Sequence, residues 1–315
     1  MKSAVIVGIF GQDGQFLCSH LEKNGYVVTG IGKNEVYSSD ESWKKLIDIN
    51  KKGDVAFLIK KLQPDEIYYL AAFNHSSEDI KEEISQLLTS SYLVNVLNYI
   101  NFLESIVEYS KTTRIFYAAS SHIYGDTKEH IQDESTKFSP RSIYAITKLD
   151  GLLLSRYFRS KHLIHSSVGI LYNHESHLRH PNFVSRKIVK AAVEIKKGLR
   201  DELILGDLNA RMDWGYTGDY VGAMYQIVNH EKPDDYIIAS GKMIKLVDFV
   251  KVVFKELEIS WGKFVKEDKS LLKRKFSATY CGNPAKLTSV TGWKPTTDLD
   301  HLARIMVKKE LERHK

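Results

Sequence analysis

An apolar strand that runs directly into three evenly spaced glycines is the feature that most restricts the fold. Ser3–Val7 has the composition of a buried strand, and an amphipathic helical pattern follows the glycines as far as Leu21. Glycines at this spacing let the backbone turn tightly and approach a pyrophosphate, and the helix behind them directs free N–H groups at that anion. We therefore expect the seat of a dinucleotide at Gly8, Gly11, Gln12, Asp13 and Gly14.

Short β-rich runs alternate with amphipathic helical patterns through the first half of the chain. After the first strand, we expect strands at Tyr26–Ile31, Lys45–Ile49, Glu66–Leu70, Arg114–Ala119 and Ser166–Leu171. This alternation is typical of a parallel sheet that is covered by helices on both faces. The predicted fold class is α/β, with a Rossmann-type, doubly wound parallel sheet.

The alternation breaks up from about residue 173. Helical patterns and short strands then mix, at Phe183–Lys197, Leu203–Leu205, Gly218–Asn229, Tyr236–Ala239 and Leu246–Leu257. Ligands of open α/β sheets bind in the crevice at the carboxyl ends of the strands, so a smaller C-terminal domain over that edge would bind substrate. We expect a dinucleotide-binding Rossmann domain at residues 1–172, to which residues 216–240 return, and a mainly substrate-binding domain at residues 173–315.

The composition is that of a globular protein from a reducing compartment. The 315 residues, 43% of them hydrophobic, supply a sizeable core. No apolar run reaches the roughly 18 residues of a membrane span, and the N-terminus leads into a strand rather than a signal peptide. Cys18 and Cys281 lie far apart and form no Cys-x-x-Cys spacing, which argues against a disulfide framework or a zinc knuckle. We expect a cytoplasmic protein that does not enter a membrane.

The net charge of +6 is concentrated toward the C-terminus. Residues 261–315 hold 13 Lys and Arg against 6 Asp and Glu. These basic residues are not interleaved with aromatic residues in the way of a stacking platform for bases, so we expect no nucleic-acid partner. A small dianionic ligand fits the excess better.

Tyr144 and Lys148 stand four residues apart at the start of a predicted helix, so their side chains share one face. A nearby ammonium favours the phenolate and is expected to lower the pKa of Tyr144 toward neutral pH. Ser120 follows a predicted strand and is placed to hydrogen-bond to the same substrate hydroxyl. Together with the glycine turn, these residues predict proton transfer coupled to hydride transfer at a sugar carbon.

The end of the second predicted strand bears on the choice of cofactor. It carries no Asp or Glu to bind the ribose hydroxyls of NAD, whereas Lys33 there would meet the 2′-phosphate of NADP. A solvated loop lysine is a nearly equal interpretation, so NAD stays possible. Asp48 and Ile49, at the end of the third predicted strand, are placed to contact the adenine.

Longer motifs along nearly the whole chain resemble one known family. They are Gly8–Gly14, Gln63–Tyr68 leading to Leu70–Ala72, Pro140–Lys148, Asn173–Ser176, Phe183–Lys187, Leu205–Gly215 and Gly292–Pro295. The chain resembles the extended short-chain dehydrogenases/reductases and, within them, the GDP-mannose 4,6-dehydratases. Those enzymes bind NADP, remove hydride from C4 of the sugar, eliminate water across C5 and C6, and return the hydride to C6.

The resemblance implies roles for individual residues. It places Ser120, Tyr144 and Lys148 in the redox step at C4. Further cofactor contacts would come from Leu70, Ala71 and Ala72. Substrate would be bound by Asn173, by Val184 and Lys187 near the guanine nucleotide, and by Arg211 or Arg274 at the diphosphate. Family members form dimers and tetramers, and on this ground alone we expect a homodimer or homotetramer.

One departure from the family pattern affects the chemistry. The family carries a glutamate that takes the C5 proton and helps to expel the C6 hydroxyl, and this chain has His122 in its place. An imidazole can act as a general base near neutral pH. Either His122 does the work of the glutamate, or elimination is abandoned and the chain is a 4-keto-sugar reductase, a C4 dehydrogenase or an epimerase. A spectator role for His122 also stays open.

Other departures concern anion binding. Met212 stands where the family has a second basic residue, so bidentate pairing with phosphate is lost there. Lys33 and Asn34 stand where the family has paired arginines, which weakens the preference for NADP.

Two further hypotheses remain. His174, His177 and His180 recur every third residue, but they lie in a predicted loop without cysteines or paired carboxylates, so we expect no metal. A non-catalytic dinucleotide-binding module is the remote alternative to an enzyme. The intact set of Ser120, Tyr144 and Lys148 argues against it.

Overall fold

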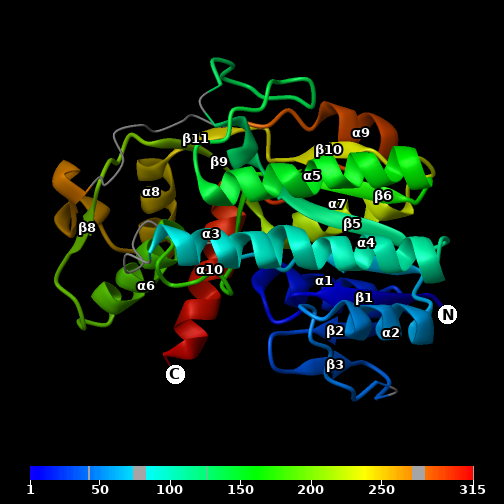
Figure 1. Ribbon diagram of the computed structural model, residues 1–315. Coiled ribbons are helices and arrows are strands. Elements are labelled where there is room, and N and C mark those ends of the chain that lie inside the picture. Colours follow the sequence, from blue (N-terminus) through cyan, green and yellow to red (C-terminus); the bar gives the residue numbers. More distant parts are fainter. Residues whose placement is uncertain (42, 74–82, 126, 272–280, 315) are drawn as a thin grey trace.

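A seven-stranded sheet forms the centre of the molecule (Figure 1). The computed structural model describes residues 1–41, 43–73, 83–125, 127–271 and 281–314. The strands lie in the order β10-β6-β5-β4-β1-β2-β3, and all neighbours are parallel except β3, which is antiparallel to β2. Their bounds are β1 Ser3–Val7, β2 Val27–Ile31, β3 Val36–Ser38, β4 Glu66–Tyr69, β5 Arg114–Ser120, β6 Ser166–Leu171 and β10 Asp235–Ile238.

Helices cover both faces of this sheet, as a parallel sheet with nearly continuous apolar strands requires. The helices α2, α4 and α5 share one apolar core with one face, and α1, α7 and α9 share a second core with the other. Their bounds are α1 Gln12–Lys23, α2 Lys52–Leu62, α4 Asn98–Tyr109, α5 Ile143–His162, α7 Thr217–Asn229 and α9 Ala285–Thr291. A further helix, α3 (Ile84–Tyr92), runs into α4 through one π-helical turn at Leu93–Leu97. The predicted doubly wound α/β fold is confirmed.

A smaller lobe with a core of its own lies at one end of the sheet (Figure 1). Its helices are α6 (Val184–Lys196), α8 (Leu246–Glu256) and α10 (Leu299–Arg313). Short strands complete it: β7 Asn173–Glu175, β8 Leu203–Leu205, β9 Arg211–Tyr216, β11 Met243–Lys245 and β12 Val265–Glu267. A buried ion pair, with Nη1 of Arg186 2.6 Å from Oε2 of Glu310, fixes α6 to α10.

The expected strand at Lys45–Ile49 is wrong. Trp43 and Ile47 of this region are buried without a strand partner: Trp43 packs against Phe57 of α2, and Ile47 is almost fully inaccessible. The edge position is taken by β3, which a tight turn brings back beside β2, with the Gly32 N–H donating to the Glu35 carbonyl over 2.9 Å. Packing against a helix satisfies the same apolar pattern that predicted a strand.

The order of the strands creates a crevice beside β1. From β1 the chain moves outward to β2 and β3, and it then returns to β4 on the other side of β1. Ligands of such sheets bind outside the carboxyl ends of the strands at this switch point. The loops after β1 and β4 meet there: a Cβ on Gly8, whose φ is +94°, would lie 2.9 Å from the Ala71 nitrogen.

Candidate active site

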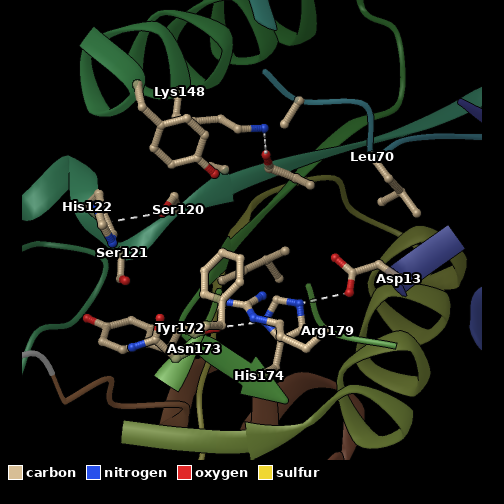
Figure 2. Close-up of a pocket in the computed structure, with 16 residues that line it drawn as sticks. Asp13, Leu70, Ser120, Ser121, His122, Lys148, Tyr172, Asn173, His174 and Arg179 are labelled. Atoms are coloured by element: carbon tan, nitrogen blue, oxygen red, sulfur yellow. Dashed lines mark hydrogen bonds and ion pairs between the residues drawn. The ribbon is translucent and has the colours of Figure 1, made fainter. Parts of the chain in front are cut away.

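A hollow of about 190 Å³ opens at the carboxyl ends of β5 and β6, beside the glycine turn (Figure 2). Leu70 and Ala72, which follow β4, line one part of it, and Ala118 and Ala119 of β5 line another. Its polar and titratable side chains are Asp13, Ser120, Ser121, His122, Tyr144, Lys148, Asn173, His174 and Arg179. The hollow therefore concentrates groups that can exchange protons.

The four residues predicted as catalytic come together in this hollow. Ser120 ends β5, and its hydroxyl accepts from the His122 N–H over 3.3 Å, which starts the short 3₁₀ turn Ser121–Tyr124. Tyr144 and Lys148 lie in the first turns of α5, which begins after an N-cap at Ser142 whose hydroxyl accepts from Ala145 N–H. The His122 ring stands edge-on to the Tyr144 ring, with 5.9 Å between the ring centres.

The expected lowering of the Tyr144 pKa is wrong for the protein without ligands. Burial raises the pKa of Tyr144 to about 12, although a hydrogen bond with Ser120 and the nearby Arg179 charge act in the opposite direction. Burial also lowers the pKa of Lys148 to about 7. The Lys148 ammonium donates to the Ala118 carbonyl over 2.7 Å and lies 5.8 Å from the centre of the Tyr144 ring, so it faces β5 rather than the phenol (Figure 2). Desolvation thus outweighs the attraction on which the prediction relied.

The glycine turn has the shape that a dinucleotide needs. A Cβ on Gly14 would lie 2.4 Å from the Gly8 carbonyl oxygen, so only glycine allows α1 to start this close to β1. A Cβ on Gly11 would meet only that same oxygen, at 3.2 Å, so the outer side of the turn is open. No side chain caps the first turn of α1, which leaves its N-terminal dipole available to an anion. These residues fit the pyrophosphate of a dinucleotide cofactor.

An ion pair between Asp13 and His174 connects the glycine turn to the strand after β6. Oδ1 of Asp13 lies 2.9 Å from Nε2 of His174, whose Nδ1 lies 2.7 Å from the Tyr172 carbonyl oxygen, and the His174 ring stacks on Tyr220 (Figure 2). Burial alone would raise the pKa of Asp13, but the charge and hydrogen bond of His174 lower it below its usual value. Burial alone would lower the pKa of His174, but Asp13 raises it above its usual value.

Sequence analysis did not anticipate this pair, because its members are far apart in the chain. The signal was present, since Asp13 belongs to the glycine motif and His174 to the motif Asn173–Ser176. A second link has the same effect: the Gln12 amide donates to the His174 carbonyl over 3.1 Å, and the Ser176 hydroxyl donates to Gln12 over 2.7 Å. The glycine turn and the segment after β7 therefore form one unit.

Arg179 is a further residue of the hollow that sequence analysis missed. Its guanidinium lies 3.9 Å from the centre of the Phe183 ring, and its Nε lies 3.4 Å from Oε2 of Glu175. Both Arg179 and Phe183 line the hollow. Only the histidines of this segment had drawn attention, and no regular spacing marked the arginine.

Of the other predicted cofactor residues, Lys33, Asp48, Ile49 and Ala71 are not part of the lining of this hollow. Lys33 is exposed in the turn between β2 and β3. The Asp48 carboxylate accepts from the Asn50 N–H over 3.0 Å, and this bond lowers the pKa of Asp48. Ile49 is half-buried, and its carbonyl accepts from the Asn101 amide over 3.2 Å. Leu70 and Ala72 line the hollow, whereas Ala71 supports the glycine turn from behind.

A second hollow, of about 210 Å³, holds two of the predicted substrate residues. Val184 and Lys187 of α6 line it, together with residues 205–207, Ala210, Leu246 and Leu271. The two hollows adjoin at the start of α6, because Phe183 lines the first and the next residue, Val184, lines the second.

The remaining predicted substrate residues are dispersed. Asn173 lines the first hollow. Arg211 is exposed at the start of β9 and is part of neither lining. Arg274 lies outside the described residues.

The histidines of the 174–180 segment point to different partners. His174 pairs with Asp13, the His177 ring stands edge-on to Phe16, and His180 is exposed. Among the described residues, no three metal-binding side chains lie close enough to hold an ion. No helix in the described part of the chain is both long and apolar enough to cross a bilayer.

Comparison with known proteins decides which family this arrangement represents. Residues 5–306 match the family model for GDP-mannose 4,6 dehydratase. The chain belongs to the GDP-mannose 4,6-dehydratase family. It is 33% identical over 328 residues to GDP-mannose 4,6 dehydratase 2 of Arabidopsis thaliana, an alignment that covers 99% of this chain and 87% of the relative. It is 30% identical over 361 residues to GDP-mannose 4,6-dehydratase of Yersinia enterocolitica, with 100% and 95% covered.

Solved structures show the same fold. RMD from Pseudomonas aeruginosa, complexed with NADPH, matches with a TM-score of 0.85 at 19% identity, covering 99% of this chain and 100% of the other. The dTDP-glucose 4,6-dehydratase of Bacillus anthracis, in complex with NAD, matches with a TM-score of 0.81 at 16% identity, covering 99% and 97%. These are extended short-chain dehydrogenase/reductase folds, as the motifs predicted.

Membership of this family confirms the predicted class of function. The chain is an NAD(P)-dependent nucleotide-sugar enzyme of the dehydratase type, and the family to which it belongs uses NADP. The family assignment does not include the roles of individual residues in this chain, among them that of His122.

Proposed function

We propose that this protein removes water from a GDP-linked, mannose-configured sugar to give the corresponding 4-keto-6-deoxy sugar. One observation carries the proposal: Ser120, His122, Tyr144 and Lys148 all line a single hollow at the carboxyl ends of the strands, next to the glycine turn. NADP, when bound at that turn, would accept the C4 hydride and return it at C6.

Tyr144 and Ser120 would act on the C4 hydroxyl. Tyr144, as the phenolate, takes the hydroxyl proton as the C4–H bond breaks, and the Ser120 hydroxyl orients the same oxygen. Lys148, with a pKa of about 7, supplies a positive charge that favours the phenolate when it is protonated.

His122 would carry out the elimination. With a ketone at C4, the C5 proton is acidic, and the imidazole takes it while the C5=C6 double bond forms and the C6–O bond breaks. The departing hydroxyl leaves as water after it receives a proton from the imidazolium. C5 would take a proton from solvent when the hydride returns to C6, and Tyr144 would release its proton to solvent, so the net change is the loss of one water. The position of the His122 ring beside Tyr144 supports this role, because both must reach neighbouring carbons of one sugar.

A second candidate is oxidoreduction or epimerisation at C4 without elimination. It is favoured by the same substitution, since a carboxylate acts in the family where His122 stands here. Under this alternative, Ser120, Tyr144 and Lys148 suffice and the C6 hydroxyl is kept.

The two adjoining hollows support an extended nucleotide-sugar substrate. We assign the sugar to the first hollow and the nucleotide to the second, with Val184 and Lys187 as contacts and Arg211 as a candidate diphosphate ligand. In this assignment residues 1–172, with 216–240, bind the dinucleotide and residues 173–315 mainly bind the substrate. The helix α6, at whose start the hollows adjoin, is supported by the buried Arg186–Glu310 pair.

We further propose a cytoplasmic homo-oligomer. The two cysteines, Cys18 and Cys281, are free and buried, which suits a reducing compartment.

The outer face of α3, the π-helical turn and α5 exposes large apolar side chains: Leu88 44%, Leu97 51%, Leu153 47% and Tyr157 53%. Such a face is typical of an interaction surface. Sedimentation of the wild type should give a dimer or tetramer, and Leu153→Arg should give a monomer; a monomeric wild type contradicts this proposal.

Variants at His122 test the reaction type. We expect the wild type, with NADP and GDP-mannose, to form a product lighter by one water in mass spectrometry. Replacing His122 by Gln should abolish water loss while oxidation at C4 survives, and replacing it by Glu should restore water loss. Undiminished water loss in the Gln variant would contradict the role of His122, and a wild-type product of unchanged mass would favour the second candidate.

A further inference from the structure

The second hollow contains a carboxylate that the proposed reaction does not use. Its walls are largely aliphatic, from Val184, Leu205, Leu246 and Leu271, and its charged side chains are Lys187 and Asp207. At about 210 Å³ it is smaller than the ~300 Å³ or more of a site for a drug-sized ligand, and it suits a single planar ring system. A slot with apolar walls and few polar groups is typical of a site that binds a base.

The Asp207 carboxylate is held in one place by its own turn. Oδ1 accepts from the Asn209 N–H over 2.8 Å, and the Asp207 carbonyl accepts from the Ala210 N–H over 3.3 Å. The Leu208 N–H donates to Oε1 of Glu267 over 3.0 Å, which ties the turn to β12. A carboxylate fixed in this way is prepared to receive hydrogen bonds from a ligand without losing further side-chain freedom.

The charge of Asp207 indicates which part of a nucleotide it meets. Asp207 and Lys187 are the charged side chains that line this hollow, and no ion pair of Asp207 occurs among the described residues. A carboxylate of this kind repels a diphosphate and attracts N–H groups. It therefore belongs to the end of the slot that receives the N–H edge of a base, whereas the Lys187 ammonium supplies a donor for acceptor atoms of the same nucleotide.

We propose that Asp207 selects guanine, which rests on the proposed function of the second hollow as the nucleotide site. Guanine presents two adjacent donors, N1–H and the exocyclic 2-amino group, which a carboxylate accepts with both oxygens. Adenine, uracil and thymine present no such pair of neighbouring donors. Asp207 is thus the residue that distinguishes a GDP-sugar from a UDP- or dTDP-sugar in this chain.

Calorimetric titration with GDP, IDP and UDP tests the assignment. IDP differs from GDP only by the missing 2-amino group, so it isolates the contact in question. We expect the wild type to bind GDP at least ~10-fold more tightly than IDP or UDP. In Asp207→Asn, GDP affinity should fall by ~10-fold or more, and the GDP-to-IDP ratio should approach one. Asp268→Asn is the matched control, because Asp268 is a half-buried carboxylate, like Asp207, in a similar turn with Ser270 and lines neither hollow.

The outcomes separate this inference from the proposed function. Equal binding of GDP and IDP by the wild type overturns the role of Asp207 without any variant. So does an unchanged GDP-to-IDP ratio in Asp207→Asn, and in both cases tight GDP binding leaves the proposed function intact. A wild type that binds none of the three nucleotides contradicts the proposed function itself, since the second hollow would then not be a nucleotide site.

Discussion

The two hollows that adjoin at the start of α6 differ in the side chains that form them. The first is surrounded by titratable side chains whose pKa values are moved by burial and by one another, among them Asp13, Tyr144, Lys148 and His174. The second has aliphatic walls and a carboxylate held by its own turn. Proton chemistry in the first hollow therefore depends on the removal of water from its titratable groups, whereas recognition in the second hollow depends on its shape and on one fixed charge. Damage to the first should reduce turnover, and damage to the second should reduce affinity.

Removing the Tyr144 hydroxyl should have the largest effect. In Tyr144→Phe we expect kcat to fall by at least ~100-fold, because a positioned acid–base group contributes that much or more, while GDP and NADPH affinities stay within ~2-fold. Steady-state kinetics and fluorescence titration measure the two. Tyr109→Phe, at the far end of α4, is the control. A variant that keeps its turnover would remove Tyr144 from the chemistry.

Closing the glycine turn should affect cofactor binding next most strongly. In Gly14→Ala the new Cβ meets the Gly8 carbonyl oxygen at 2.4 Å, so β1 and α1 must separate, and NADPH affinity should fall by ~10-fold or more. Gly222→Ala in α7 is the control, since a Cβ there meets nothing within 4 Å. Equal NADPH affinity in the two variants would show that the turn is not the cofactor seat.

The burial of Lys148 in the first hollow should make the free energy of unfolding depend on pH. Its pKa is about 7 in the folded protein and 10.5 in the reference state, so between these values the unfolded chain holds one more proton. The free energy of unfolding should therefore rise with pH in this interval, by up to ~1.4 kcal/mol per pH unit, relative to Lys148→Met. Denaturant titrations of both proteins at about pH 7.5, 8.5 and 9.5 measure the difference between their free energies of unfolding. A constant difference would contradict the lowered pKa.

Removing the charge of Lys187 should have the smallest effect. In Lys187→Gln we expect KM for the nucleotide sugar to rise by ~3- to 10-fold with kcat unchanged, because a half-buried charged contact to a bound ligand contributes about that much. Lys190→Gln, one turn further along α6 and exposed, is the control. A loss of kcat instead would mean that the two hollows do not divide turnover and affinity in this way.

The residues of the first hollow could be predicted from the sequence better than those of the second, and the reasons are physical. The glycine turn and the Tyr144–Lys148 pair are local patterns, and a helix or a turn brings their members together wherever the chain goes. The Asp13–His174 pair joins a residue of α1 to a residue of β7, so only the tertiary fold reveals it. Asp207 had no spacing that marked it as a ligand.

Two predictions failed because they depend on tertiary packing. Trp43 and Ile47 are buried without forming the expected strand, because an apolar pattern predicts that residues are buried but does not indicate which element packs against them. The Tyr144 pKa moved in the opposite direction to the prediction, because sequence spacing shows the neighbouring charge and not the loss of water around the phenol.

NMR of the product formed from GDP-mannose and NADP in heavy water tests the central claim most directly. If His122 eliminates water after oxidation at C4, the product carries a C6 methyl group with deuterium at C5, and His122→Gln forms no methyl group. A C4 ketone or epimer that keeps its C6 hydroxyl would contradict the claim and show that His122 marks a change of reaction.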